Sequence, residues 1–202
     1  MSKGERTRQM IVERAAEVFN TRGYFGSSMS DLVRETGLEK GGIYNHFDSK
    51  EALALAAFEH AVGLVGARFH AALAGRERAI DRLRAIVEVF RELADDQLLP
   101  GGCPILNTAV ETDDAHPVLR DRARAAMTDW LRLIGGTVKR GVQSGQLRPD
   151  TDPRAVASVV TATLEGAIML SRLYGDPAHM HRAVDHLTGY LGSLEVRVTD
   201  GE

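Results

Sequence analysis

The chain has 202 residues, of which 44% are hydrophobic and 26% are charged, and its formal net charge is −3. This composition is typical of a soluble globular protein and excludes a mostly disordered chain, a collagen-like repeat and a disulfide scaffold. A single cysteine permits no internal disulfide and indicates a reducing compartment, so we expect a cytoplasmic protein. No long apolar run and no signal-peptide pattern is present, so no membrane association is expected.

The net charge taken alone argues against a nucleic-acid binder, but the charge is unevenly distributed. Residues 1–50 contain eight Lys/Arg and seven Asp/Glu, whereas the remaining 152 residues contain 17 and 21. The resulting values of +1 and −4 have the signs expected of a DNA-binding head on an acidic body, although the difference is small.

Apolar residues recur every three or four positions along nearly the whole chain, which is typical of amphipathic helices. No convincing strand pattern interrupts them, so we predict an all-α fold of about nine helices. The first helix spans about residues 5–22, and Ser28 to Asp31 form a capping box for the second. Asp152-Pro153 and Asp176-Pro177 begin the last two helices. The loop of note is residues 97–104.

Three short helices precede residue 48 and must pack together, because each alone buries little surface. We therefore divide the chain into a head, residues 1–48, and a helical body, residues 49–202. The second helix, the turn Thr36-Gly37-Leu38 and a short third helix over about residues 39–46 have the layout of a helix-turn-helix. In that layout the second of the two helices enters the major groove of DNA.

The short third helix has a composition that suits a surface better than a core. Gly41 and Gly42 lie in its first turn, where each costs about 1 kcal/mol relative to alanine. A backbone that must approach DNA closely explains this choice. Lys40, Tyr44 and His46 add charged and hydrogen-bonding groups at the same surface, and Lys50 lies at the start of the next helix.

Residues 11–55 resemble the TetR family of bacterial transcriptional regulators. The matching segments include Thr36-Gly37-Leu38, Lys40-Gly41-Gly42-Ile43-Tyr44, and His46-Phe47 followed by Ser49-Lys50-Glu51-Ala52-Leu53. The resemblance implies an N-terminal three-helix DNA-binding head and a C-terminal helical domain for ligand binding and dimerisation. It also implies contacts with operator DNA. The implied contact residues are Ser28, Lys40, Gly41, Gly42, Tyr44, Asn45, His46 and Lys50.

Two positions depart from the family pattern. Glu39 stands where a small capping residue is common, and a carboxylate there is repelled by phosphate although it suits a helix N-terminus. Asn45 occupies a position that is often larger or basic, and asparagine can read adenine or simply face solvent.

The body offers a dimer face and a tentative effector pocket. Small residues interleave the apolar positions of the last two long helices and permit close helix approach between two copies, although the same helices can also close the monomer core. They are Ala157, Thr161, Gly166, Ala167, Gly189 and Gly192. The candidate pocket residues mix apolar surface with a few polar groups. They are Phe90, Cys103, Leu106, Asn107, Val110, Met127, Trp130, Ile134, Glu165 and Met169.

Cys103 follows Gly101-Gly102 and precedes Pro104 at the expected start of a helix, where a thiolate is favoured. The loop resembles that of electrophile-sensing repressors of the N-ethylmaleimide reductase type, which leaves a thiol sensor as an alternative to a buried apolar cysteine. No enzyme motif, cofactor site or metal site is expected. The primary hypothesis is a homodimeric repressor released from a palindromic operator by a small-molecule effector. A helical enzyme or a protein-interaction module without DNA binding is the alternative from another class.

Overall fold

The computed structural model describes residues 1–95 and 99–196, so Gln97 and Leu98 of the expected 97–104 loop lie outside the described residues. Within these ranges the chain forms nine α-helices and no strand, only one isolated bridge between Leu147 and Glu195. This confirms the predicted all-α fold. The helices group into two compact units, residues 1–66 with 97–126, and residues 67–96 with 127–202.

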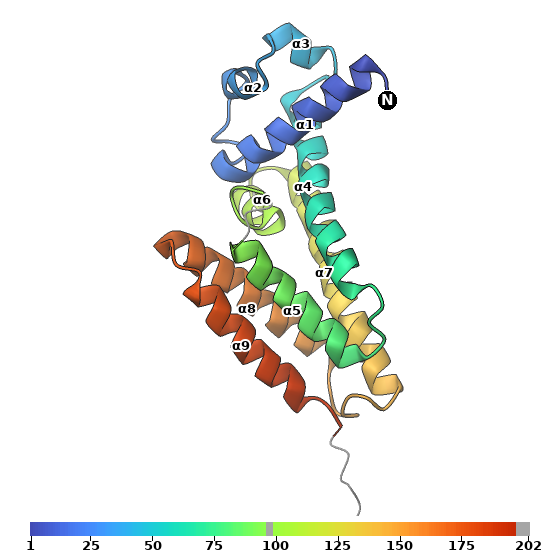
Figure 1. Cartoon of the computed structure of the whole chain (residues 1–202). Helices are drawn as coiled ribbons and strands as arrows, with labels where there is room; N and C mark the ends of the chain where they lie inside the picture. Colours follow the sequence, from blue (N-terminus) through green and yellow to red (C-terminus); the bar gives the residue numbers. More distant parts are fainter. Residues whose placement is uncertain (96–98, 197–202) are drawn as a thin grey trace, which may run out of the picture. The chain divides into compact units, whose positions relative to one another are not determined.

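The first unit contains the three N-terminal helices in the order that the sequence predicted, although the first of them is not short, with 20 residues. They are α1 (Lys3–Arg22), α2 (Met29–Thr36) and α3 (Lys40–Tyr44). The unit also holds the first part of α4 (Lys50–Leu73), all of α6 (Pro104–Thr112) and the first part of α7 (Pro117–Gln143). Helix α6 therefore packs with the N-terminal helices, although it lies far from them in sequence (Figure 1).

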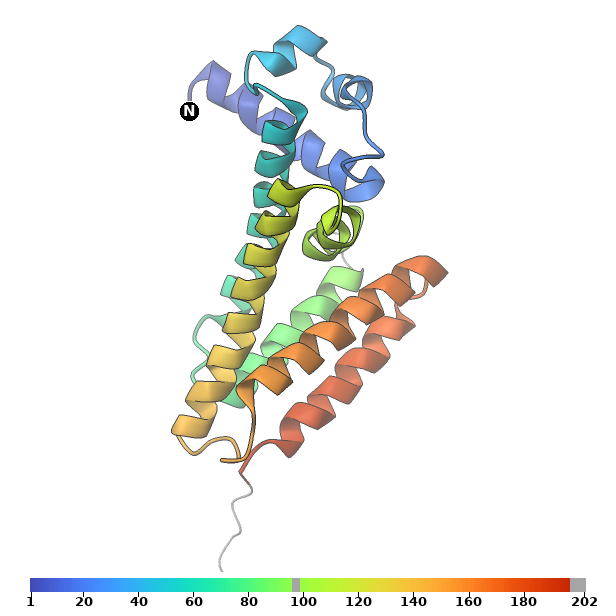
Figure 2. The same ribbon diagram turned by 180° about the vertical axis from the view of Figure 1, so that it is seen from behind.

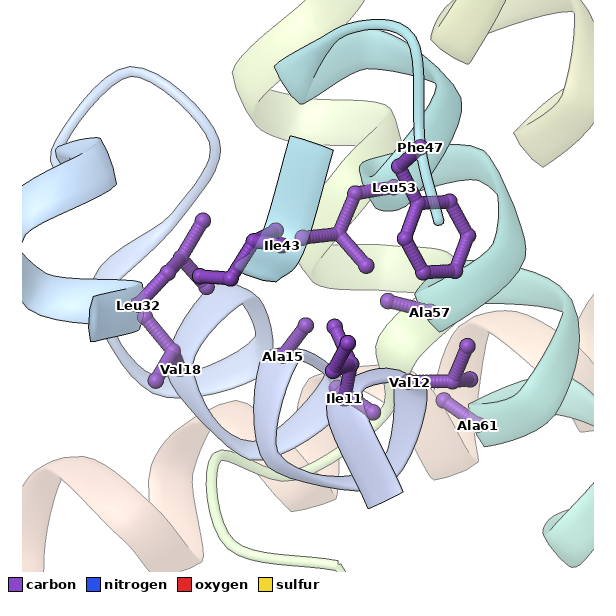
Figure 3. Packing of buried hydrophobic residues seen from close by; sticks show 11 residues of the cluster. Ile11, Val12, Ala15, Val18, Leu32, Ile43, Phe47, Leu53, Ala57 and Ala61 are labelled. Atoms are coloured by element: carbon purple, nitrogen blue, oxygen red, sulfur yellow. The ribbon is translucent and has the colours of Figure 1, made fainter. Parts of the chain in front are cut away.

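One apolar cluster joins the helices of the first unit. Ile11, Val12 and Ala15 of α1 face α4, and all three are buried (Figure 3). The cluster residues of α4 are Leu53, Ala57 and Ala61. Helices α2 and α3 each add one fully buried side chain to the cluster, Leu32 and Ile43. Burial of such residues fixes the two short helices that could not be stable alone.

The second unit contains α5 (Ala79–Asp95), α8 (Pro153–Tyr174), α9 (Ala178–Ser193) and the later parts of α4 and α7. Helix α9 packs against both α5 and α8, and the three lie side by side in both views (Figures 1 and 2). Gly135 lets α7 approach α8, because a Cβ there would lie 3.3 Å from the Pro153 carbonyl oxygen. Asp152 caps α8 as predicted. Helix α9 begins at Ala178, one residue later than predicted, and Pro177 is its N-cap residue. The Asp176 carboxylate accepts from the Ala178 amide.

Helices α4 and α8 are each long and apolar enough to cross a membrane by length and composition alone. The core helices of water-soluble proteins pass the same test. Only 33% of the most apolar window of α4 and 39% of that of α8 is buried within the chain.

Candidate nucleic-acid interface

The start of α2 is held by the capping box that the sequence predicted. The Ser28 hydroxyl accepts from the Asp31 amide at 3.2 Å, and the Asp31 carboxylate accepts from the Ser28 amide at 2.8 Å. Arg22 of α1 and Arg34 of α2 both donate to the same carboxylate, at 3.0 and 2.7 Å. Hydrogen bonds from Ser28 and from Arg34 hold the pKa of Asp31 well below its usual range. Ser28 thus lies at the predicted surface with its hydroxyl engaged in the cap.

Because the pKa of Asp31 is depressed by folding, its stabilising contribution is complete above the unfolded value of about 4. It is lost as the pH falls below that value. We expect the thermal midpoint of the wild type to drop more steeply between about pH 5 and pH 2 than that of Asp31→Asn, which lacks the titrating group. Circular dichroism melts at stepped pH measure the difference. Equal slopes for the two proteins would contradict the assignment.

Helix α3 presents its backbone to solvent. A Cβ added to Gly41 would meet nothing within 4 Å, and one added to Gly42 would make only an ordinary contact with Leu38. Neither glycine has a positive φ. The fold therefore requires glycine at neither position, and their helix-destabilising effect has no structural compensation within the described residues.

Helix α3 has one buried side chain, and its other side chains are exposed or half-buried. Ile43 is buried, whereas Tyr44 is 41% exposed with the Lys40 ammonium 5.9 Å from its ring centroid. Asn45 is exposed at the C-terminal end of α3, and His46 is half-buried. Of the predicted contact residues in and after α3, Lys40, Gly41, Tyr44 and Asn45 are exposed, whereas Gly42 and His46 are half-buried.

Lys50 is the first residue of α4, as the sequence predicted, and its ammonium has a partner within the first unit. Its ammonium donates to the backbone carbonyl oxygen of Tyr24 and lies 4.2 Å from the centre of that ring. Burial lowers the pKa of Lys50, while the Glu111 and Asp31 carboxylates oppose the change. In this structure the Lys50 charge is engaged within the first unit.

The tentative effector residues are divided between the two units. Cys103, Leu106, Asn107 and Val110 belong to the first unit, and Val110 is 70% exposed. The other six belong to the second unit, where Met169 is also exposed. They are Phe90, Met127, Trp130, Ile134, Glu165 and Met169.

An aromatic cluster in the second unit gathers Phe90 and Trp130 with Phe69, which the sequence analysis did not select. The ring centroids of Phe69 and Trp130 are 4.3 Å apart, and those of Phe90 and Trp130 are 5.5 Å apart. The Trp130 Nε1 atom is buried without a hydrogen-bond partner among the described residues, and so is Thr161 Oγ1. Buried polar side-chain atoms in proteins usually have a hydrogen-bond partner, and a bound water or ligand can be that partner.

A cavity in the first unit has room for only about two water molecules, with a volume of about 30 Å³. Its lining includes Asn20, Tyr24 and Glu111. It contains none of the tentative effector residues and is too small for a typical ligand pocket. Within the described parts of the chain, no three His, Cys, Asp or Glu residues are grouped to hold a metal ion.

Comparisons with known proteins agree with the helix-turn-helix geometry. Residues 11–57 match the sequence model described as bacterial regulatory proteins, tetR family, and residues 79–187 match that of the tetracyclin repressor-like C-terminal domain. The chain belongs to the TetR family. A TetR transcriptional regulator from Chloroflexus aurantiacus J-10-FL is 45% identical, with a TM-score of 0.93 over 96% of this chain and 98% of that one.

Two further relatives support the same assignment. A TetR-family transcriptional regulator from Cytophaga hutchinsonii is 37% identical, with a TM-score of 0.89 over 98% of each chain. The HTH-type transcriptional repressor DhaR of Mycobacterium sp. (strain GP1) is 28% identical over 82% of each chain. The TetR-family chain described here is thus a DNA-binding transcriptional regulator, and the alternative of a helical enzyme is excluded.

Proposed function

We propose that this TetR-family regulator is a cytoplasmic, homodimeric repressor that binds a palindromic operator and is released by a small-molecule effector. The observation that carries the proposal is the pair of glycines on α3, which the fold does not require and a close partner does. Residues 1–48 would form the reading head and residues 49–202 the effector-binding and dimerisation domain. We assign DNA contacts to the residues predicted from the sequence, and Lys50 can donate to a phosphate while it keeps its bond to Tyr24, because an ammonium has three donors.

The test uses the duplex that in vitro selection with the wild-type chain enriches. Gly41→Ala is expected to stabilise the head by about 1 kcal/mol, because alanine is the better helix former. The same change adds a methyl group at the DNA-facing backbone, so we expect about ten-fold weaker operator binding, equivalent to about 1.4 kcal/mol. Fluorescence anisotropy and thermal melting measure the two effects.

Gly63→Ala on α4 is the matched control. That glycine is also exposed, and a Cβ there would meet nothing within 4 Å. It should give the stability gain without the loss of affinity. Failure of the wild-type chain to enrich any duplex, or to show salt-dependent binding, would overturn the proposed function.

The dimer interface that we propose is the outer face of α8. Val159, Ala162, Gly166, Met169 and Leu173 follow one another at steps of three and four, which places them on one stripe. Met169 is 54% and Leu173 71% exposed, and a Cβ on Gly166 would meet nothing within 4 Å. A second copy of the same stripe would cover this surface with α8 packed on α8, and it would place two heads on a two-fold operator.

The sequence-based choice of interface residues needs a correction. Ala157, Thr161 and Ala167 are buried within the second unit, where α7 and α9 pack around α8. They close the monomer core and are unavailable to a partner. Gly166 and the exposed Gly189 remain compatible with the interface, and the half-buried Gly192 lies near Arg84.

For the effector we propose an apolar, ring-containing molecule with a hydrogen-bond acceptor. Phe69, Phe90 and Trp130 supply aromatic surface, and the Trp130 indole N–H, which has no partner among the described residues, supplies a polar anchor. Trp130 is also the single tryptophan of the chain, so its fluorescence reports on the site directly. Ligand screening by thermal shift should identify compounds that raise the melting midpoint and change this fluorescence.

The second candidate function is a thiol sensor. Cys103 is half-buried and is the N-cap residue of α6, where the helix dipole favours a thiolate. The preceding loop contacts α1, because the Asn20 amide donates to the carbonyl oxygens of Pro100 and Gly102. The thiolate sulfur would bond to one carbon of the N-ethylmaleimide double bond while the other carbon takes a proton from water, and the bulky adduct would displace the loop from α1. Release of Cys103→Ser from DNA by the same reagent would contradict this candidate.

A further inference from the structure

The turn that joins α1 to α2 is held by a side chain from α6. One carboxylate oxygen of Glu111 accepts from the Tyr24 amide at 2.7 Å, and the other accepts from the Phe25 amide at 2.8 Å. The three residues belong to the same compact unit, although 86 and 87 positions of sequence separate the partners. Two parallel bonds to one carboxylate fix both the position and the direction of this backbone.

Gly23 makes the close approach possible. Its φ of 77° lies in the region that favours glycine, and a Cβ at this position would overlap the Glu111 carboxylate. The first residue after α1 is therefore shaped for the carboxylate from α6.

The same turn is held from its other side by α4. Lys50 donates to the Tyr24 carbonyl oxygen, so the backbone of Tyr24 is bound at its amide by α6 and at its carbonyl by α4. The ring of His116 packs edge-on against the Tyr24 ring at 4.8 Å, and its Nε2 lies 3.2 Å from a Glu51 carboxylate oxygen. Tyr24 thus contacts side chains from α4, from α6 and from the connection between α6 and α7.

A second set of bonds joins the start of α6 to the end of α1. The Asn107 amide donates to the Asn20 backbone carbonyl oxygen at 3.2 Å and to the Gly101 carbonyl oxygen at 2.8 Å. A Cβ on Gly101 would overlap the Asn20 backbone. Both ends of α6 therefore contact the last turn of α1 or the turn that follows it.

We propose that Glu111 is a positioning residue for operator recognition, a role that rests on the proposed function. Helix α2 begins at Met29, four residues after Phe25, and α3 begins four residues after α2 ends. A displacement of the turn is therefore passed through short connections to the surface that reads DNA. Glu111 touches neither DNA nor effector in this role. It fixes the direction in which the helix-turn-helix leaves α1.

The negative charge of Glu111 and its positioning role predict opposite changes in DNA affinity when the carboxylate is removed. A carboxylate in the DNA-binding unit repels phosphate, so its removal should strengthen DNA binding if electrostatics alone mattered. Removal of a positioning contact should weaken binding to the selected duplex and leave binding to random DNA unchanged or slightly stronger. The ratio of the two affinities separates these effects from a general loss of stability.

The experiment compares wild type, Glu111→Gln and the control Glu17→Gln, which removes an exposed carboxylate from α1 in the same unit. Hydrogen exchange of residues 23–28 and binding to the selected and random duplexes are measured on the full chain. In Glu111→Gln we expect about ten-fold faster exchange of the Tyr24 and Phe25 amides and a similar loss of specificity ratio, because one of the two acceptors is lost. Glu17→Gln should change neither.

Unchanged exchange in Glu111→Gln, or faster exchange with an unchanged specificity ratio, would overturn the proposal. Glu111→Asp keeps the charge on a shorter side chain and should give intermediate values for both measurements. It also provides the same two tests if the glutamine variant does not fold. A wild-type chain without any preferred duplex would instead contradict the proposed function, and the exchange rates would still report on the contact itself.

Discussion

Ile43→Ala should lower the free energy of unfolding of the head by about 2–5 kcal/mol, the usual range for removal of a large buried aliphatic side chain. Ile43 is 1% exposed and is the one buried residue of the five-residue helix α3. It reaches the cluster formed by Leu32 and Leu53 (Figure 3). Because a helix this short is not stable by itself, operator binding should be lost together with stability. Urea unfolding and anisotropy titration with the selected duplex measure both.

The neighbouring residue provides the control for this result. Tyr44 is 41% exposed, so Tyr44→Ala should change stability by no more than about 0.5 kcal/mol. If Tyr44 contacts DNA as we propose, the same change should weaken operator binding by about ten-fold. Equal losses of stability in the two variants would show that Tyr44 is a packing residue instead.

The part of the fold that could be predicted from sequence is the part fixed by local interactions. The capping box of Ser28 and Asp31 joins residues three apart, and the Asp152-Pro153 start of α8 depends on neighbours only. The exposed face of α3 also follows from a few consecutive residues. These features need no knowledge of the rest of the chain.

Contacts between distant segments could not be predicted in this way. Glu111 is an ordinary helical glutamate in the sequence, and nothing within α6 indicates that it binds the backbone of Tyr24. Lys50 fits a phosphate-contact pattern, yet its burial and its bond to Tyr24 depend on how α4 packs. Phe69 became part of the aromatic cluster for the same reason.

Helix α8 shows a further limit, because periodicity identifies apolar stripes without saying what covers them. Thr161 and Ala167 belong to a stripe that the chain covers itself, whereas Met169 and Leu173 belong to one that it leaves exposed. Small residues occur in both stripes. Only the packing of the other helices of the second unit distinguishes them.

Charged substitutions in the exposed stripe of α8 should strongly weaken the proposed dimer. Met169→Asp combined with Leu173→Asp would place two carboxylates from each copy at the proposed α8 interface, where each would be desolvated and would face its counterpart. We expect the dimer dissociation constant to rise by at least about 100-fold, which corresponds to 2.7 kcal/mol. Sedimentation equilibrium over a range of concentrations measures it. The fold of the monomer should be unchanged, because both side chains are exposed in the single chain.

Val118→Asp is the matched control, since this valine is 44% exposed on α7 in the first unit and lies outside the α8 stripe. It should leave the dimer intact. Because two linked heads bind two half-sites as one event, the double variant should also lose operator affinity, by more than the change in any single DNA contact. An unchanged dimer in the double variant would place the interface elsewhere. A monomeric double variant with wild-type operator affinity would instead show that one head suffices for recognition.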